Sequence, residues 1–297
     1  MKNAVSKYSL LLSLVIAVTA CGGGNGDGST ESEDGDQSAG LEDGDNSTDT
    51  DTDTGTDTGT DTEGTISACF NSDLITAGTR VIRTTLMPSD EHRSEDWIKR
   101  EVTEAVGQTT YEGVAVLESI YLIDTKTDSG DLVSESNMTR YDIYNVSEST
   151  IATFASEYES VTYNDGNIHR ASGVTRYSPA GFTYSFGLSE GQSFSEEWVG
   201  TDEGSLGTTT ISYSRTGTYV GVETLTVLAG TFQTCRFDST LVQVLSIEGS
   251  DDLTYTTEMT NWLLVGAGIL IQSEFNGEIS GQLQSATIND VDVLSNN

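Results

Sequence analysis

The feature that most constrains the fold is a succession of short segments rich in β-branched and aromatic residues. Several of them alternate apolar and polar residues with a period of two, which is the pattern of a strand with one buried face. Clusters of Gly, Asn, Asp and Ser separate the segments, and Asp165-Gly166 is typical of a two-residue hairpin turn. The segments span residues 79–87, 111–123, 139–144, 150–158, 208–219, 239–247, 255–264 and 268–275.

Many strands at roughly even spacing, with only two prolines in the chain, predict an all-β domain. The architectures that fit are an antiparallel curved sheet, a sandwich, and a barrel or half-barrel. The window 94–106 is ambiguous, because its apolar residues Trp97, Ile98, Val102 and Val106 match the i, i+4 stripe of a helix as well as they match a strand. Both interpretations stay open for that window.

The first 20 residues are organised like a secretory signal peptide. Lys2 and Lys7 supply positive charge, and residues 8–18 form an apolar stretch of 11 residues. That stretch is shorter than the roughly 20 residues needed to cross a bilayer. It leads into residues 18–21 (VTAC), which resemble the lipobox of bacterial lipoproteins.

The lipobox resemblance implies that the chain is cleaved before Cys21 and that Cys21 carries diacylglycerol and a further acyl chain such as palmitate. Several acyl chains anchor a protein stably, whereas a single chain is marginal. Gly22, rather than Asp, follows the cysteine, which by the same resemblance implies sorting to the outer membrane. An ordinary cleaved signal peptide is the alternative interpretation.

Residues 22–65 are a low-complexity segment with 14 Asp or Glu and no Lys or Arg. Because such a segment buries too little apolar surface to offset chain entropy, we expect a disordered linker that spans about 35–40 Å as a coil. Asp49, Asp51 and Asp53 match the first positions of an EF-hand loop, but Thr54 stands where Gly is required. We therefore expect no metal site in this linker.

The predicted organisation is a lipoprotein signal peptide at 1–20, a lipidated cysteine and linker at 21–65, and a single β domain at 66–297. The last part has 232 residues, with 11 Lys and Arg against 33 Asp and Glu, which leaves a net charge of −22. Phosphate backbones and anionic headgroups repel so acidic a domain. We therefore expect no nucleic-acid partner.

A set of short motifs is spread over residues 68–79 (ACFN…GT), 188–192 (LSEGQ), 221–232 (GVETLTVLAGTF) with Cys235, and 261–270 (NWLL…GAGIL). Together they resemble a group of uncharacterised bacterial secreted proteins and lipoproteins. The resemblance implies a curved antiparallel β domain, similar to the half-barrels of periplasmic lipoprotein carriers, and it implies no activity. The group's pattern has Pro where this chain has Leu228, and we expect the chain to turn at Ala229-Gly230.

The chain has three cysteines, and Cys235 could serve as a nucleophile, a metal ligand, half of a disulfide or a small core residue. With Cys21 lipidated, Cys69 and Cys235 remain as an even pair in an oxidising compartment. The resemblance pattern carries both positions together and so implies a disulfide between them. A reactive thiol would need a neighbouring base or cation, and Arg236, although adjacent, points to the opposite face of a strand.

Residues 187–191 (GLSEG) match the nucleophile-elbow pattern G-x-S-x-G, with Ser189 as the candidate nucleophile. That motif needs a helix after the serine, but residues 192–200 are strand-like. His92 and His169 both precede Ser189, so the hydrolase order of serine, acid and histidine fails. We expect a β-turn here and no catalytic residue.

His92 lies in a charged run with Asp90, Glu91 and Glu95, and His169 could join it in space to bind a metal. The run has neither a His pair at helical spacing nor a C-x-x-C, which metal sites commonly show. A solvated loop is therefore the favoured interpretation, and we expect no metal.

Glu196 and Glu197 stand beside Trp198, a combination that could suggest carboxylates with an aromatic platform for a sugar. Adjacent residues of a strand point to opposite faces, so the two carboxylates do not form a catalytic pair. We expect Trp97, Trp198 and Trp262 to be core or edge aromatics.

The function that best fits these observations is an outer-membrane-anchored lipoprotein with a non-enzymatic β domain, in a structural or partner-binding role in the envelope. Its partners would be the membrane, through Cys21, and an envelope protein. The alternative is a carrier or sensor that binds a hydrophobic ligand, such as an acyl chain or lipid, in a β half-barrel. An enzyme is disfavoured, because no nucleophile, base and orienting group can be assembled, and no cofactor is expected.

Overall fold

The computed structural model describes residues 69–90, 93–145, 149–164, 166–205, 207–246 and 252–294. The predicted signal peptide, the predicted lipidation site Cys21, the acidic linker, Glu91 and His92 lie outside these residues. A four-residue 3₁₀ helix, η2 (Ser72–Ile75), precedes the strands.

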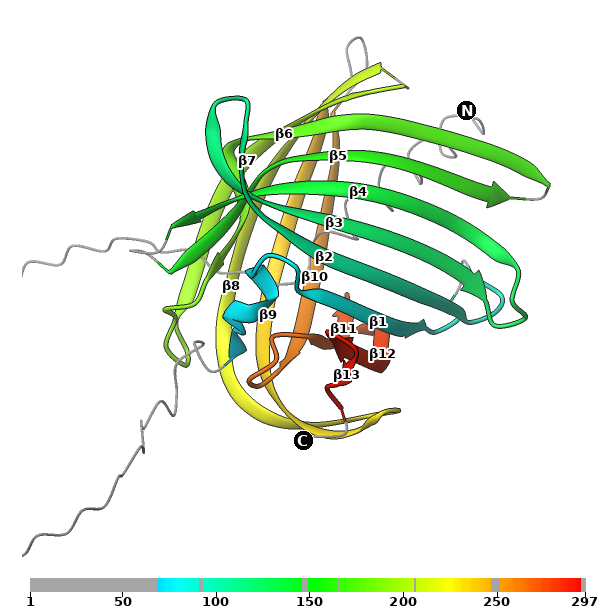
Figure 1. Ribbon diagram of the computed structural model, residues 1–297, viewed down its shortest axis with the longest axis vertical. Coiled ribbons are helices and arrows are strands. Elements are labelled where there is room, and N and C mark those ends of the chain that lie inside the picture. The colour runs from blue at the N-terminus through cyan, green and yellow to red at the C-terminus, as the bar shows by residue number, and fades with distance from the viewer. Residues whose placement is uncertain are drawn as a thin grey trace, which may run out of the picture.

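Twelve antiparallel strands, each paired with its neighbour in the chain, form one sheet that closes on itself (Figure 1). A short thirteenth strand pairs with the end of the twelfth. The strands are β1 (Arg80–Met87), β2 (Trp97–Tyr111), β3 (Val114–Thr127), β4 (Leu132–Asn145), β5 (Thr150–Asn164), β6 (Asn167–Ser185), β7 (Ser193–Gly204), β8 (Gly207–Val227), β9 (Gly230–Ser246), β10 (Leu253–Leu264), β11 (Leu270–Phe275), β12 (Glu278–Ile288) and β13 (Val291–Asp292).

The predicted all-β antiparallel class is confirmed, and among the architectures considered the structure is a closed barrel. Closure comes from β1 and β12, which pair from Val81 with Ile288 to Leu86 with Gln282. Closing the sheet satisfies the backbone groups that a half-barrel would leave at two free edges.

Strand β2 contains the ambiguous window 94–106 from Trp97 onward, so the helical interpretation is wrong. The predicted segment 111–123 is also partly wrong, because the chain turns at Glu112 and Gly113, whose φ angles are +50° and +84°. The hairpin predicted at Asp165-Gly166 is confirmed by the pairing of Asn164 with Asn167. Strands β6, β12 and β13 were absent from the predicted segments, whereas β7 contains most of the stretch 192–200 that was interpreted as strand-like.

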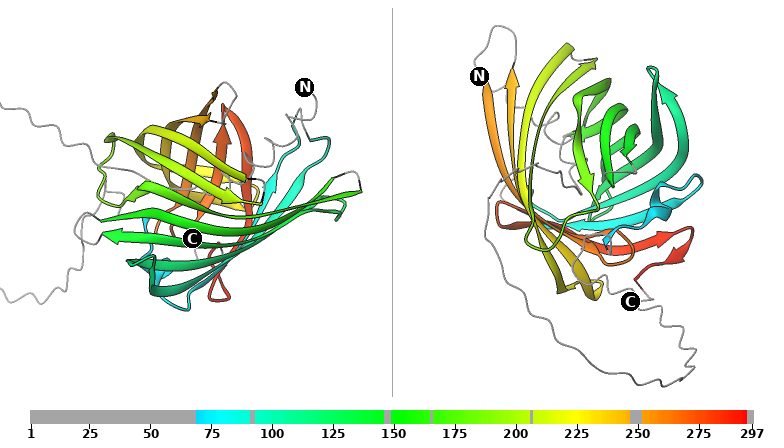
Figure 2. Two further views of the ribbon diagram at one scale, coloured as in Figure 1. Left: turned by 90° about the horizontal axis from the view of Figure 1, so that it is seen from above. Right: turned by 90° about the vertical axis from the view of Figure 1, so that its left-hand side faces the viewer.

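Strands β2–β6 make one curved wall, and β7–β10 run steeply across it as the other (Figures 1 and 2). One core cluster, built mainly from large side chains, follows the interior around β4–β10, and we call it the interior belt. Every member is less than a tenth exposed. Its members are Met138, Tyr158, Tyr177, Phe182, Trp198, Tyr213, Leu241 and Met259.

The tip of the β2–β3 hairpin packs on β4 and β5 in a separate small cluster. Tyr111 stacks on Tyr141 with ring centres 3.9 Å apart and donates its hydroxyl to Glu157 at 3.1 Å. Glu112, in the turn of this hairpin, forms an ion pair with Arg176 of β6 at 2.8 Å. The hairpin is thereby fixed to its neighbours by stacking and by an ion pair.

Candidate functional site

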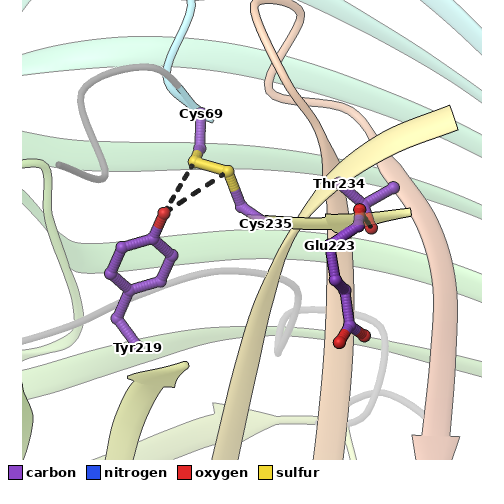
Figure 3. Close-up of a disulfide and its surroundings, with 5 residues drawn as sticks. All are labelled: Cys69, Tyr219, Glu223, Thr234 and Cys235. Carbon is purple, nitrogen blue, oxygen red and sulfur yellow. Dashed lines mark hydrogen bonds between the residues drawn. A yellow bond between two sulfur atoms is a disulfide. The ribbon is translucent and has the colours of Figure 1, made fainter. Parts of the chain in front are cut away.

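Cys69 and Cys235 form a disulfide, with Cα atoms 6.1 Å apart, that joins the start of the described chain to β9 (Figure 3). Both residues are buried. The hydroxyl of Tyr219 lies 3.8 Å from the Cys69 sulfur and 3.9 Å from the Cys235 sulfur. The bonded Cys235 therefore offers no free thiol for nucleophilic or metal chemistry in this structure.

The motifs behind the sequence resemblance converge around this disulfide. Cys69, Leu188, Tyr219, Cys235 and Leu263 belong to one buried cluster, although they come from distant parts of the chain. The turn in motif 221–232 lies at residues 228–229, because Val227 pairs with Gly230. The expected turn at Ala229-Gly230 is thus displaced by one residue.

Aromatic rings pack against one another on the interior face of the barrel. Trp198 of β7 and Tyr213 of β8 are a registered pair whose rings stack 5.1 Å apart at an interplanar angle of 7°. The ring of Phe182 meets Trp198 edge-on at 4.6 Å. Gly181 lies directly against this indole, since a Cβ added there would stand 2.4 Å from Trp198 Cδ1.

Charged side chains share the interior face with these rings. In β1 and β2, Arg83 and Lys99 both pair with the buried carboxylate of Glu101, Lys99 at 3.1 Å. Burial alone would raise the pKa of Glu101, but Arg83 and Lys99 outweigh it and lower that pKa to about 2. Glu101 is therefore a charged, compensated group inside the barrel.

Two further carboxylates are buried among the belt strands. Asp142 of β4 accepts a hydrogen bond from Arg140 Nε at 2.8 Å, yet burial still raises the pKa of Asp142. Asp202 of β7 accepts hydrogen bonds from the hydroxyls of Tyr158 and Thr175, each at 3.0 Å. Burial raises the pKa of Asp202 as well. Each carboxylate has its hydrogen-bond donors within the barrel wall.

Glu196 and Arg215 form the most deeply placed pair. They are registered partners in β7 and β8, and their side chains are 11% and 3% exposed. Glu196 Oε2 also accepts the backbone N–H of Thr183 in β6 at 2.9 Å, and Arg215 Nη2 donates to the carbonyl of Thr183 at 2.9 Å. One ion pair thus joins three strands.

Among the described residues, the others singled out in the sequence do not meet in a site. Ser189 lies in a tight turn, where its carbonyl accepts the N–H of Gln192 at 3.0 Å, as expected. His169 is exposed on β6, and Glu197 is exposed beside the inward-facing Glu196. Within the described ranges, no group of three or more His, Cys, Asp or Glu is placed to hold a metal ion.

Of the three tryptophans, Trp198 and Trp262 are buried and Trp97 is half-buried. Trp262 is buried and donates its indole N–H to Glu223, with the guanidinium of Arg236 lying 5.7 Å from its ring centre. The guanidinium of Arg93 lies 5.4 Å from the ring centre of Trp97.

As far as the chain is described, it has no helix long and apolar enough to cross a membrane.

Sequence reasoning missed the interior ion pairs, because charged residues in a strand are ordinarily assigned to the solvent face. A signal does exist in β2, where Lys99 and Glu101 alternate with Ile98 and Val102. Lys99 and Glu101 share a face of β2 with Thr103, which pairs with Tyr121, and Tyr121 in turn pairs with Met138 of the interior belt. The alternation therefore places these charges inside the barrel.

No protein-family model matches the chain, and no curated protein matches it either. Similar solved structures include a Bacteroides fragilis protein described as exported and as having a YmcC-like fold. It is 11% identical with a TM-score of 0.35, and the match covers 71% of this chain and 96% of that one. Another is a Parabacteroides distasonis protein described as a lipoprotein, at 14% identity and a TM-score of 0.31, covering 76% and 99%. Similarity at this level does not assign a function.

Proposed function

We propose that this chain is an outer-membrane-anchored lipoprotein of the cell envelope whose β-barrel is non-enzymatic and has a structural or partner-binding role. The observation that carries the proposal is the interior belt. Rings of the belt pack on one another, as Trp198 does on Tyr213 and Phe182. The paired charges of Glu196 and Arg215 stand on the same interior face, whereas a channel for an acyl chain needs a continuous apolar lining. The same packed and charged interior argues against the alternative, a carrier for a hydrophobic ligand.

The charge distribution supports an external role. Four of the positive side chains, Arg83, Lys99, Arg140 and Arg215, are taken up by interior pairs with Glu101, Asp142 and Glu196. The negative excess of the domain therefore lies mainly on its outside. An envelope partner would have to be neutral or basic where it contacts the barrel, because like charges repel.

The anchor is tested by mass spectrometry of the N-terminal peptide from protein purified out of bacterial membranes. We expect an acylated Cys21 as the first residue and recovery with the outer membrane. In the Cys21→Ala variant, we expect no acylation and loss of that location. An unmodified mature N-terminus at any other residue would disprove the anchor.

The non-carrier role is tested separately by native mass spectrometry of the intact lipoprotein after release from detergent. We expect the mass of the acylated chain alone. A stoichiometric, non-covalently bound lipid that survives release would instead support the carrier. The two experiments are independent, because the anchor is covalent and lies outside the barrel.

A further inference from the structure

Strands β6 and β7 are neighbours in the barrel wall, but a backbone ladder joins them over only part of the length of β6. Strands β6 and β7 pair only from Gly173 with Gly204 to Ser178 with Val199. Beyond that point β6 runs on to Ser185, and β7 begins at Ser193. We call residues 179–185 of β6 and 193–198 of β7, where they face each other, the seam.

Side chains replace the missing ladder in the seam. The backbone of Thr183 is held by Glu196 through its N–H and by Arg215 through its carbonyl. These are two contacts through one ion pair, where a ladder would give a regular series of backbone bonds. The stretch also carries strain, because Phe182 has a φ angle of +49°, a left-handed conformation that non-glycine residues rarely adopt.

Both ends of the seam are fixed, which limits what can move. Ser178 closes the β6–β7 ladder. At the other end the ring of Phe186 stacks 3.6 Å from that of Phe70, the residue next to the disulfide-bonded Cys69. The Phe186 N–H also donates to Ser149 at 2.7 Å. Movement is thereby confined to the few residues between these two points.

We propose that the seam is a built-in lateral opening of the barrel, with the Glu196–Arg215 pair as its latch. When the latch releases Thr183, residues 179–185 separate from β7 while the other strand pairs stay closed. Opening uncovers the indole of Trp198, which Gly181 and Phe182 now cover. This inference concerns the motion of the barrel and does not depend on the membrane anchor or on the identity of any partner.

Hydrogen exchange of the full mature protein, followed by mass spectrometry of peptides, tests the opening. Amides that exchange through local opening lose protection ahead of those in intact ladders. We expect the Thr183 amide, which Glu196 holds in the closed seam, to exchange at least about tenfold faster than the amides in 173–178 of the same strand. Protection of the Thr183 amide equal to that of 173–178 would overturn the proposal.

The latch is tested with Glu196→Gln and its matched control Glu197→Gln, the exposed neighbour. A hydrogen bond to a charged group is stronger than one to a neutral group. Glu196→Gln should therefore speed exchange of the Thr183 amide by roughly fivefold more than exchange in the other strands, where the uncompensated Arg215 also lowers protection. We expect Glu197→Gln to leave exchange unchanged. The same acceleration in both variants, or acceleration spread evenly over all strands, would exclude a latch. If Glu196→Gln fails to fold, the wild-type comparison of the Thr183 amide with those of 173–178 still decides.

Discussion

Glu196 of β7 and Arg215 of β8 are a registered cross-strand pair inside the barrel, and both also contact the backbone of Thr183 in β6. Buried ions of this kind are costly to desolvate, so the pair adds little net stability compared with apolar residues of the same size. Removing only one partner is different, since it leaves an uncompensated charge in the interior. The pair therefore makes the wall sensitive to single substitutions.

The first prediction is that Arg215→Met lowers the free energy of unfolding by about 3–5 kcal/mol. The cause is the buried carboxylate of Glu196, which loses its cation. Urea unfolding at neutral pH measures the change. The control is Arg176→Met, whose pairs with Glu112 and Glu203 are exposed and should cost at most about 1 kcal/mol.

The double variant Glu196→Leu with Arg215→Met distinguishes charge from packing. If uncompensated charge causes the loss, the double variant should be more stable than Arg215→Met alone. The explanation would be contradicted if the double variant lost as much free energy of unfolding as Glu196→Leu and Arg215→Met lose together, or more.

The second prediction concerns close packing between β6 and the interior belt. Gly181→Ala would place a methyl group 2.4 Å from Trp198 Cδ1, so the indole or the strand must shift at a cost of about 1–3 kcal/mol. Gly187→Ala is the matched control, because nothing lies within 4 Å of its added Cβ. Thermal unfolding, together with the fluorescence of the tryptophans, measures both. Equal stability of the two variants would mean that the contact is not tight.

The local part of the fold could be predicted from the sequence. Turn chemistry placed the hairpin at Asp165-Gly166, and the short apolar runs gave the antiparallel class. Closure of the barrel could not be predicted, because Val81 and Ile288 meet across almost the whole domain and no local pattern encodes that pairing. The helix–strand ambiguity of 94–106 has a physical origin as well. In β2, Lys99 and Glu101 face inward, which hides the usual alternation of apolar inside and polar outside.

The site was harder to predict than the fold. The sequence indicated Cys69 and Cys235 as a pair, and the structure contains their disulfide. The Glu196–Arg215 pair was not foreseen, because a carboxylate and a guanidinium 19 positions apart become neighbours only through the β7–β8 register. The sequence did predict that the adjacent Glu196 and Glu197 point to opposite faces of a strand, and the structure confirms this.

The third prediction is a pH dependence of stability through Glu101. Its pKa falls from 4.5 to about 2 in the folded barrel. Because the folded pKa is depressed, this carboxylate stabilises the fold above the unfolded value, by about 3 kcal/mol, and the contribution disappears as the pH falls through the folded value.

Urea unfolding of the wild type and of Glu101→Gln, from pH 7 down to pH 3, isolates this contribution. We expect the wild type to be the more stable at neutral pH and its advantage to shrink steadily below about pH 4.5. The pKa of Asp142 is raised in the folded barrel, so Asp142 destabilises the fold as the pH rises. This effect is the same in the wild type and in Glu101→Gln and cancels in their difference. A difference that stays constant with pH would rule out the Glu101 contribution.

The last prediction concerns the disulfide that fastens the start of the domain to β9. Cys69 and Cys235 are separated by 166 residues, and cross-linking so long a loop restricts the unfolded chain by up to about 5 kcal/mol. We therefore expect the double variant Cys69→Ser with Cys235→Ser to unfold at distinctly lower urea concentration than the wild type.

Alkylation of the non-reduced protein, followed by mass spectrometry, should label neither cysteine. A reductant should lower the midpoint of the wild type and leave the double variant unchanged. A labelled Cys235 in the folded, non-reduced protein would show that the two sulfurs are not joined.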